Sequence, residues 1–309
     1  MAPMDQTAPH FADPIPANAL PNRAGIGLKA QHYQELHDGL PDDIGWLEVH
    51  SENHMCAGGP TSHWLNAFRE RYPISLHGVG MSLGSAGPLD PVHLQRLVDL
   101  DGRVEAARIS EHLSWSIARN ATGGGDYLND LIALPYTEES LDIFATHVIE
   151  MQDALKRPVL IENPSSYLRY EHSVIAEPEF LCEVVKRTDC GVLLDVNNVY
   201  VSARNHGFDA HEYIAQVPGE RVGEIHLAGH SQTTFNGRTI RIDDHGSPVC
   251  DAVWDLYAHT IERIGAKPTL IEWDSNIPEL NVLLGEARKA DAILAAAQSK
   301  PEVRHAAAI

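Results

Sequence analysis

Cysteine is scarce in this sequence of 309 residues: Cys56, Cys182, Cys190 and Cys250 stand apart, and no two of them form a CxxC pair. This spacing argues against a zinc site built on thiolates. A chain of this length also buries enough apolar surface to fold without a framework of disulfides. We therefore expect free cysteines, most of them buried as is usual for this residue.

Positive charge is equally scarce, since 23 Lys and Arg stand against 43 Asp and Glu and leave a formal net charge of −20. The resulting field repels phosphate groups, which argues against nucleic acid and anionic membranes as partners. Apolar runs long enough to span a bilayer are missing, and the N-terminus lacks the basic start and apolar stretch of a signal peptide. We expect a cytoplasmic protein.

Low-complexity linkers, blocks of like charge and internal repeats are missing as well, and the prolines are spread along the chain. A single domain is the simplest organisation for such a chain, and a hydrophobic content of 43% supports a full core. We expect an irregular lead-in over residues 1–22, one domain over 23–297 and a flexible tail over 298–309.

Eight short apolar runs, each bounded by Gly, Pro or polar turns, are typical of buried strands. Helical periodicity lies between most of them, as over 89–100, 137–156, 177–188 and 251–265. Alternating strands and helices predict an α/β fold, and eight units match the size of a closed (β/α)8 TIM barrel. An open doubly wound sheet is the alternative, but no GxGxxG turn follows the first run. The runs are 25–29, 45–50, 74–78, 107–113, 158–163, 191–198, 224–229 and 268–274.

Residues that can bind metals end nearly every one of these runs. In a TIM barrel the C-terminal strand ends meet at the rim that carries the active site. One such residue alone is as readily explained as a loop anchor, but many converging ones would repel one another and lose hydration unless cations neutralise them. The sequence therefore predicts a metal site at this rim, with nearly all of the following residues as possible ligands: Glu48 and His50, His77, Glu111 and His112, Glu162 and Asn163, Asp195 and Asn198, His226 and His230, and Glu272 and Asp274.

The donor types narrow the choice of metal. Imidazole nitrogen and carboxylate oxygen without thiolate suit Zn, Mn or Fe, whereas Ca and Mg prefer shells of oxygen alone. Carboxylates can bridge two cations, so Glu162, Asp195 and Glu272 indicate a multinuclear cluster. The loop after the seventh run adds Asp243 and His245, a pair that is as readily part of a turn as a pair of ligands.

Ten motifs lie along the predicted barrel, most of them at the strand ends or just beyond: HYQEL (32–36), GWLEVHSENHM (45–55), SLHGVGMSLGS (75–85), SEHLSW (110–115), NDLIALPYTEE (129–139), IENPSSYL (161–168), LLDVNNVYVSARNHGFD (193–209), IHLAGH (225–230), DDHG (243–246) and IEWD (271–274). Together they closely resemble the multinuclear non-haem iron-dependent oxidative enzymes (MNIO), the family that includes the methanobactin-biosynthesis oxidase. More distantly, the ligand order resembles the xylose-isomerase-like barrels with trinuclear zinc, such as endonuclease IV. Both resemblances imply a xylose-isomerase-like TIM barrel.

The MNIO resemblance implies nine ligands in three sets: His77, His112 and Glu162; Glu162, Asp195, His226 and Glu272; and Asn198, Asp243 and His245. The second set also supplies the candidate catalytic residues. The endonuclease-like pattern has histidine where this chain has Asn198, and an amide oxygen is a poorer donor to a transition metal than imidazole. We therefore expect the third site to be labile or partly occupied.

The same resemblance implies the reaction and its partners. The family uses two or three iron ions, in a mixed-valent Fe(II)/Fe(III) state, and O2 as co-substrate to modify residues of a ribosomally made precursor peptide. The modified residue is usually cysteine, and a small partner protein commonly binds the leader of the precursor. We expect an enzyme of this kind, with further residues that orient ligands or grip the peptide: Glu48, His50, Asn53, Glu111, Asp130, Asn163 and Asp274.

Two other functions remain open at this point. A metallohydrolase or sugar isomerase dependent on Zn or Mn could use the same ligands, because the barrel does not dictate the chemistry. A binding protein that handles iron or copper is the non-catalytic alternative, given 18 histidines. Several of those histidines lie outside the strand ends, which argues against this last reading: His10, His32, His37, His63, His93 and His305.

Overall fold

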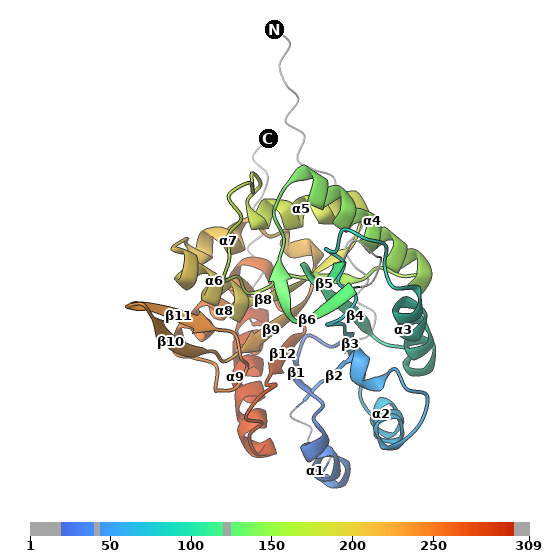
Figure 1. Cartoon of the computed structure of the whole chain (residues 1–309). Helices are drawn as coiled ribbons and strands as arrows, with labels where there is room; N and C mark the ends of the chain where they lie inside the picture. The colour runs from blue at the N-terminus through green and yellow to red at the C-terminus, as the bar shows by residue number, and fades with distance from the viewer. Residues whose placement is uncertain (1–19, 40–43, 120–124, 300–309) are drawn as a thin grey trace, which may run out of the picture.

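The computed structural model describes residues 20–39, 44–119 and 125–299 of the chain (Figure 1). Most of the expected lead-in over 1–22 and nearly all of the tail over 298–309 lie outside these residues, so the domain limits stay predictions. Across the described ranges, no helix is both long and apolar enough to cross a membrane.

A closed barrel of eight parallel strands forms the centre of the structure, as the sequence predicts. Each of the eight apolar runs supplies one strand, and the strands pair in chain order around the barrel. Nearly every residue of these strands is buried, since one face of each strand fills the barrel and the other packs under helices. The strands are β1 (Ala24–Gly27), β2 (Leu47–His50), β3 (Ile74–His77), β4 (Arg108–His112), β7 (Leu160–Glu162), β8 (Gly191–Asp195), β9 (Val222–Ala228) and β12 (Thr269–Glu272).

Helices follow the strands and cover the barrel from outside (Figure 1). The four predicted helices correspond to α3 (Pro91–Val104), α4 (Glu138–Leu155), α5 (Glu177–Thr188) and α8 (Asp251–Ile264). Side-chain caps set two of their starts: Asp90 accepts from two backbone N–H groups of α3, and Thr137 forms a capping box with Ser140 at α4. The other helices are α1 (Tyr33–Gly39), α2 (Pro60–Arg69), α6 (Val196–His206), α7 (Ala210–Gln216) and α9 (Leu280–Gln298), with short 3-10 helices η1 (Ala30–His32), η2 (Ser51–His54) and η3 (Gly219–Arg221).

Two antiparallel hairpins extend from the C-terminal ends of barrel strands, and the sequence patterns did not predict them. The first joins β5 (Ser114–Arg119) to β6 (Gly125–Ala133) directly after β4, and the second joins β10 (Ser231–Phe235) to β11 (Arg238–Ile242) after β9. Figure 1 shows the second hairpin projecting from the side of the barrel. Both hairpins therefore belong to the rim where the predicted metal ligands lie.

The register of the parallel strands brings their polar ends level with one another. His50 pairs with His77, and Asp195 pairs with His226. His112 likewise pairs with Glu162 on the neighbouring strand. Paired residues of parallel strands lie side by side, so this register alone assembles a ring of imidazoles and carboxylates at one end of the barrel.

Candidate metal centre

The first group of ligands comes from β3, β4 and β7. The Nε2 atoms of His77 and His112 each lie 3.3 Å from Oε2 of Glu162. Each histidine is held by its other nitrogen, since Nδ1 of His77 lies 2.8 Å from the Ser110 hydroxyl and Nδ1 of His112 lies 3.0 Å from the Gly78 carbonyl. The carbonyl accepts only, so Nδ1 of His112 carries the proton and Nε2 faces Glu162 with a free lone pair.

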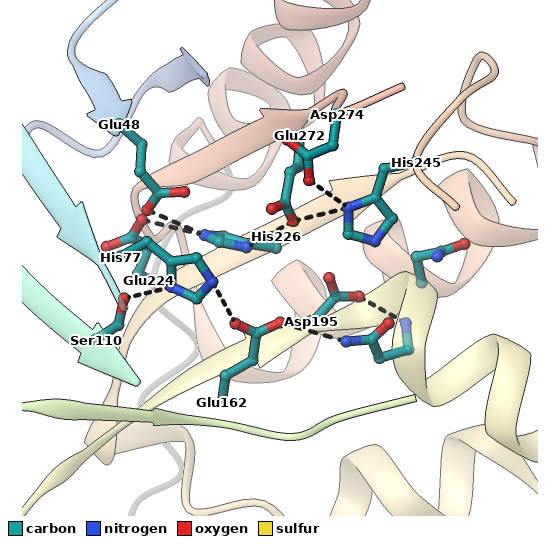
Figure 2. Close-up of polar contacts among 12 residues, drawn as sticks. Glu48, His77, Ser110, Glu162, Asp195, Glu224, His226, His245, Glu272 and Asp274 are labelled. Carbon is teal, nitrogen blue, oxygen red and sulfur yellow. Dashed lines mark hydrogen bonds and ion pairs between the residues drawn. The ribbon is translucent and has the colours of Figure 1, made fainter. Parts of the chain in front are cut away.

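The second group surrounds Glu272 at the end of β12. Its Oε2 lies 3.1 Å from Nδ1 of His226 and 3.4 Å from Nδ1 of His245 (Figure 2). Asp195 belongs to two sets whose ligand atoms lie within 4.8 Å of one another, one with Glu162 and His226 and one with His245 and Glu272. Glu162 and Asp195 therefore connect the predicted ligand sets into one continuous cluster.

Asn198 and Asp243 lie at the edge of this cluster. Asp195 caps α6 and accepts from the backbone N–H of Asn198 at 2.6 Å, which ties Asn198 to the strand end. The side-chain amide of Asn198 donates to Oε1 of Glu162 at 3.3 Å. Asp243 lies with its Oδ1 2.7 Å from Nε2 of His245. The structure thus brings all nine predicted ligands to one region, while their division into three metal sites stays a prediction.

Buried side-chain oxygens without a hydrogen-bond donor indicate that this region suits cations. Oε2 of Glu162, Oδ2 of Asp195 and Oδ1 of Asn198 are buried and have no hydrogen-bond donor among the described residues. Buried oxygens without a donor are costly, and the few found in native proteins need an explanation. Three of them beside two imidazole nitrogens form a donor set that suits a transition metal.

Burial controls the protonation of these groups. It raises the pKa of Asp195 to about 7 and, against the opposing charge of His226, raises the pKa of Glu162 well above its usual range. It lowers the pKa of His112 to about 4 and the pKa of His77 well below its usual range. Without cations, burial therefore favours protonated carboxyls at Asp195 and Glu162 and neutral imidazoles at His77 and His112, and a metal that binds there must displace the carboxyl protons.

Two buried carboxylates, those of Glu48 and Glu224, lie against His226, and the sequence patterns identified only Glu48. Nε2 of His226 lies 3.4 Å from Glu48 and 3.4 Å from Glu224, on the side of the ring away from Glu272 (Figure 2). Glu224 is completely buried and accepts from the Ser75 hydroxyl at 3.1 Å. The strand-end pattern does not identify Glu224, because this residue lies inside its strand. Its position does indicate a role, since an acidic residue two positions before a predicted ligand lies on the same face of the strand.

Asp274 and His50 lie on the outer side of the cluster, and their role as orienting residues stays a prediction. Oδ2 of Asp274 lies 3.1 Å from Nδ1 of His245, while its Oδ1 lies 2.5 Å from Nζ of Lys29. His50 faces both acids of β12 and its loop, with Nε2 3.8 Å from Glu272 and 3.7 Å from Asp274. Lys29 is a further residue that the strand-end pattern missed, because it follows β1 and is basic.

The remaining predicted residues divide into four groups. His230 lies with its Nδ1 2.9 Å from Oδ1 of Asn197 and belongs to no ligand group among the described residues. Asn163 exchanges two hydrogen bonds of 2.9 Å with the backbone of Asp195, so it holds a predicted ligand in place. Glu111 faces away from the cluster and accepts from the backbone N–H of Met81 at 3.2 Å, so it anchors the loop after β3. Asn53 and Asp130 are exposed and line cavities beside the cluster.

A cavity of about 460 Å³ lies over the cluster and gives access to it. His77, His112, Glu162 and Glu272 line its floor, and β6 contributes part of its wall with Tyr127, Asn129, Asp130 and Leu131. A volume of this size is usual for pockets that bind ligands, and it is large enough to hold several side chains of a peptide.

Several solved barrel structures have the same fold as this chain. Endonuclease IV from Thermus thermophilus superposes with a TM-score of 0.57 at 16% identity, over 89% of this chain and 100% of that one. D-psicose 3-epimerase from Clostridium cellulolyticum, solved with D-tagatose, gives 0.55 at 12% identity over 89% and 98%. At these identities the likeness shows the fold, and the class is the xylose-isomerase-like TIM barrel.

Sequence comparisons define the family within that class. Residues 23–295 match the family described as RiPP precursor modification enzyme MbnB/TglH/ChrH, in which RiPP denotes a ribosomally synthesised and post-translationally modified peptide. UPF0276 proteins of Vibrio vulnificus (50% identical over 272 residues, 88% of this chain and 91% of that one) and Bordetella parapertussis (50% over 281 residues, 91% and 95%) are close relatives. The chain belongs to this family of metal-dependent peptide-modifying enzymes, and the resemblance found in the sequence is confirmed.

Proposed function

We propose that this enzyme is a multinuclear iron-dependent oxidase that uses O2 to modify residues, specifically cysteine, of a ribosomally made precursor peptide. The observation that carries the proposal is the continuous cluster around Glu162, where imidazole nitrogens and unpartnered carboxylate oxygens converge without thiolate. Such a donor set suits iron and leaves the soft thiolate ligand to be supplied by the substrate. Membership of a family of precursor-modifying enzymes supports the choice of a peptide substrate.

The ligands would serve two or three iron ions. The first ion would be held by His77, His112 and Glu162; the second by Glu162, Asp195, His226 and Glu272; and the third by Asn198, Asp243 and His245. When bound, mixed-valent Fe(II) and Fe(III) ions would supply the redox chemistry that transfers electrons from the peptide to O2.

The protein groups around the ligands orient the imidazoles of His112 and His226. The Gly78 carbonyl keeps the proton of His112 on Nδ1, and the carboxylates of Glu48 and Glu224 hold Nε2–H of His226 so that Nδ1 faces Glu272. Near-complete burial of these groups excludes water from all but the cavity side of the cluster. A peptide cysteine that enters the cavity would therefore meet oriented ligands in a largely dehydrated site.

Reconstitution tests the proposed function directly. The protein is loaded anaerobically with Fe(II), mixed with a cysteine-containing precursor peptide and its small leader-binding partner, and exposed to O2. We expect a visible thiolate-to-Fe(III) charge-transfer band and a mass change confined to cysteine. A zinc-loaded sample is the control. Activity of the zinc form on a phosphodiester or a sugar, with no iron-dependent change of the peptide, would favour the hydrolase or isomerase instead.

A further inference from the structure

A second cavity adjoins the metal cavity at the same end of the barrel. Its volume is about 540 Å³, and its lining comes from the segments after β1 and β2 and from the start of α2. His50 lines both this cavity and the one over the metal cluster. The two cavities are therefore neighbours that share the imidazole ring of His50.

Aromatic rings form the wall of this second cavity. The rings of Tyr33 and Trp64 lie 5.5 Å apart between centroids, and both line the space. Phe68, which is fully buried, lies behind them at 5.9 Å from each ring and stacks on Trp64. Because Phe68 supports both rings from the core, the aromatic wall is formed before any ligand enters.

The charged groups beside the rings are neutralised. Nζ of Lys29 forms an ion pair with Asp274 at 2.5 Å, so its charge is already matched. Burial, with a smaller contribution from His50, lowers the pKa of His54 to about 4, so this imidazole is neutral at physiological pH. The other imidazole of the lining, His50, lies 3.8 Å from Glu272 and 3.7 Å from Asp274, and Asn53 and Thr61 add neutral polar groups. The lining therefore holds two aromatic rings, and each of its charged groups has an opposite charge beside it, which favours an uncharged aromatic ligand over an ionic one.

The spacing matches a peptide that passes the metal cluster. The ring of His50 lies 5.9 Å from the ring of His77, a predicted iron ligand. An extended peptide advances about 3.3–3.6 Å per residue and directs successive side chains to opposite faces. A side chain in the second cavity therefore belongs to a residue close in sequence to the one held over His77.

We propose that the cavity bounded by Tyr33, His50 and Trp64 is a subsite for an aromatic side chain of the peptide substrate, located one to three residues from the modified residue. This assignment rests on the proposed function only in taking the substrate to be a peptide that reaches the cluster. It adds a sequence preference that the ligand set itself does not supply, and it places the substrate along the β1–β2 side of the rim.

Short synthetic peptides test the subsite. The iron-loaded protein is titrated anaerobically by calorimetry with acetylated, amidated heptapeptides that carry a central cysteine among glycines, with one glycine replaced by Phe or Leu on either side of the cysteine. We expect at least one Phe peptide to bind about tenfold more tightly than the all-glycine parent and more tightly than its Leu counterpart.

Variants locate that gain. Trp64→Ala should abolish the preference for Phe, and Trp64→Leu, which keeps apolar bulk against Phe68, should reduce it while preserving the thermal unfolding midpoint. Phe235→Ala is the matched control, because Phe235 is an exposed aromatic residue (66%) on β10 that does not line the cavity. The control should keep the full gain.

The outcomes separate the subsite from the proposed oxidase. Equal affinity for the Phe and parent peptides, an unchanged Phe preference in both Trp64 variants, or no binding by any peptide would overturn the subsite. Peptides with serine in place of cysteine test the oxidase separately. If serine peptides bind as tightly as cysteine peptides but keep the Phe gain, the role of the thiol fails while the subsite stands.

Discussion

His226 illustrates at the scale of one residue how a barrel strand places an imidazole between two environments. Nδ1 lies against Glu272 in the metal cluster, while Nε2 lies against Glu48 and Glu224 in the barrel interior. Burial opposes the charged form, but the carboxylates of Glu48 and Glu272 outweigh it and raise the pKa of His226 well above its usual range. A metal at Nδ1 would replace one of these interactions, and the carboxylates at Nε2 would then fix the ring.

Replacement of Glu224 tests this support. Glu224→Gln keeps the size of the side chain but removes the charge that holds Nε2–H of His226, so metal affinity should fall about 10- to 100-fold with unchanged stoichiometry. Chelator competition on the loaded protein measures the change. Glu286→Gln is the control, because Glu286 is a buried glutamate that accepts from the backbone of Val249 and belongs to no ligand group among the described residues. Equal metal affinity in both variants would contradict the role given to Glu224.

Replacement of Glu162 tests the predicted bridge. Glu162→Gln removes a charge that is shared between two predicted sites, so iron content should fall by more than one ion per chain. Glu177→Gln provides the comparison, since Glu177 accepts from the hydroxyls of Tyr136 and Tyr213 and belongs to no ligand group among the described residues. Elemental analysis of both variants decides the matter: a normal iron content in Glu162→Gln shows that this carboxylate does not bridge.

The positions of the candidate ligands could be predicted from the sequence where they lie at the ends of strand-like runs. His77, His112 and Glu162 occupy the last positions of their strands, and the barrel brings such positions together. Glu111 sits in an equally suggestive place but points to the opposite face, because side chains alternate along β4. Side chains alternate between the two faces of a strand, so an error of one position in the expected end of a strand assigns a residue to the wrong face.

At the scale of elements, buried strands were predictable and exposed ones were not. All eight barrel strands coincide with apolar runs, because a strand buried on both faces must be apolar along most of its length. The β10–β11 hairpin is mostly exposed and rich in Thr and Arg, so no apolar run marks it. The β5–β6 hairpin contains a register shift between Trp115 and Ile117, which breaks the alternation that would have indicated a strand.

The hydrogen bonds between Asn163, which follows β7, and Asp195, which ends β8, lead to a prediction about these two elements. Asn163 bonds to the backbone N–H and carbonyl of Asp195, so Asn163→Ala should cost about 1–3 kcal/mol in the free energy of unfolding and weaken metal retention. Gln152→Ala is closely matched, because the Gln152 amide bonds to the backbone of Thr188 and Val159 at the opposite end of β7. Denaturant unfolding and chelator competition should show a loss of stability in both variants but metal loss only in Asn163→Ala. Equal metal retention would show that Asn163 does not position Asp195.

For the whole molecule, the buried carboxyls should make the metal-free protein less stable as the pH rises, and bound metal should reverse this dependence. Burial raises the pKa of Asp195 to about 7 and that of Glu48 to about 8, whereas these groups titrate near 3.9 and 4.3 in an unfolded chain. At these two carboxyls the folded metal-free protein thus binds more protons than the unfolded chain up to about pH 8. The stability that they contribute must therefore fall as the pH rises through that window.

The histidines do not change that sign above neutrality. His226 and His245 have raised pKa values, so the stability that their charged forms contribute is also lost as the pH rises. His77 and His112 have lowered pKa values and act in the opposite direction, but only below the ordinary imidazole value of about 6.5. Between about pH 6.5 and 8 the shifted groups of the cluster therefore act together to destabilise the metal-free protein.

Metal binding should have the opposite dependence, because a cation binds the deprotonated ligands and competes with protons for them. We expect the difference in thermal unfolding midpoint between iron-loaded and metal-free protein to grow steadily from pH 6.5 to pH 8, and metal to be lost to a chelator below neutral pH. Anaerobic scans of both forms at several pH values, at fixed iron and protein concentrations, measure this difference. A difference that stays constant across the range would mean that the buried carboxyls and imidazoles at the strand ends do not hold the metal.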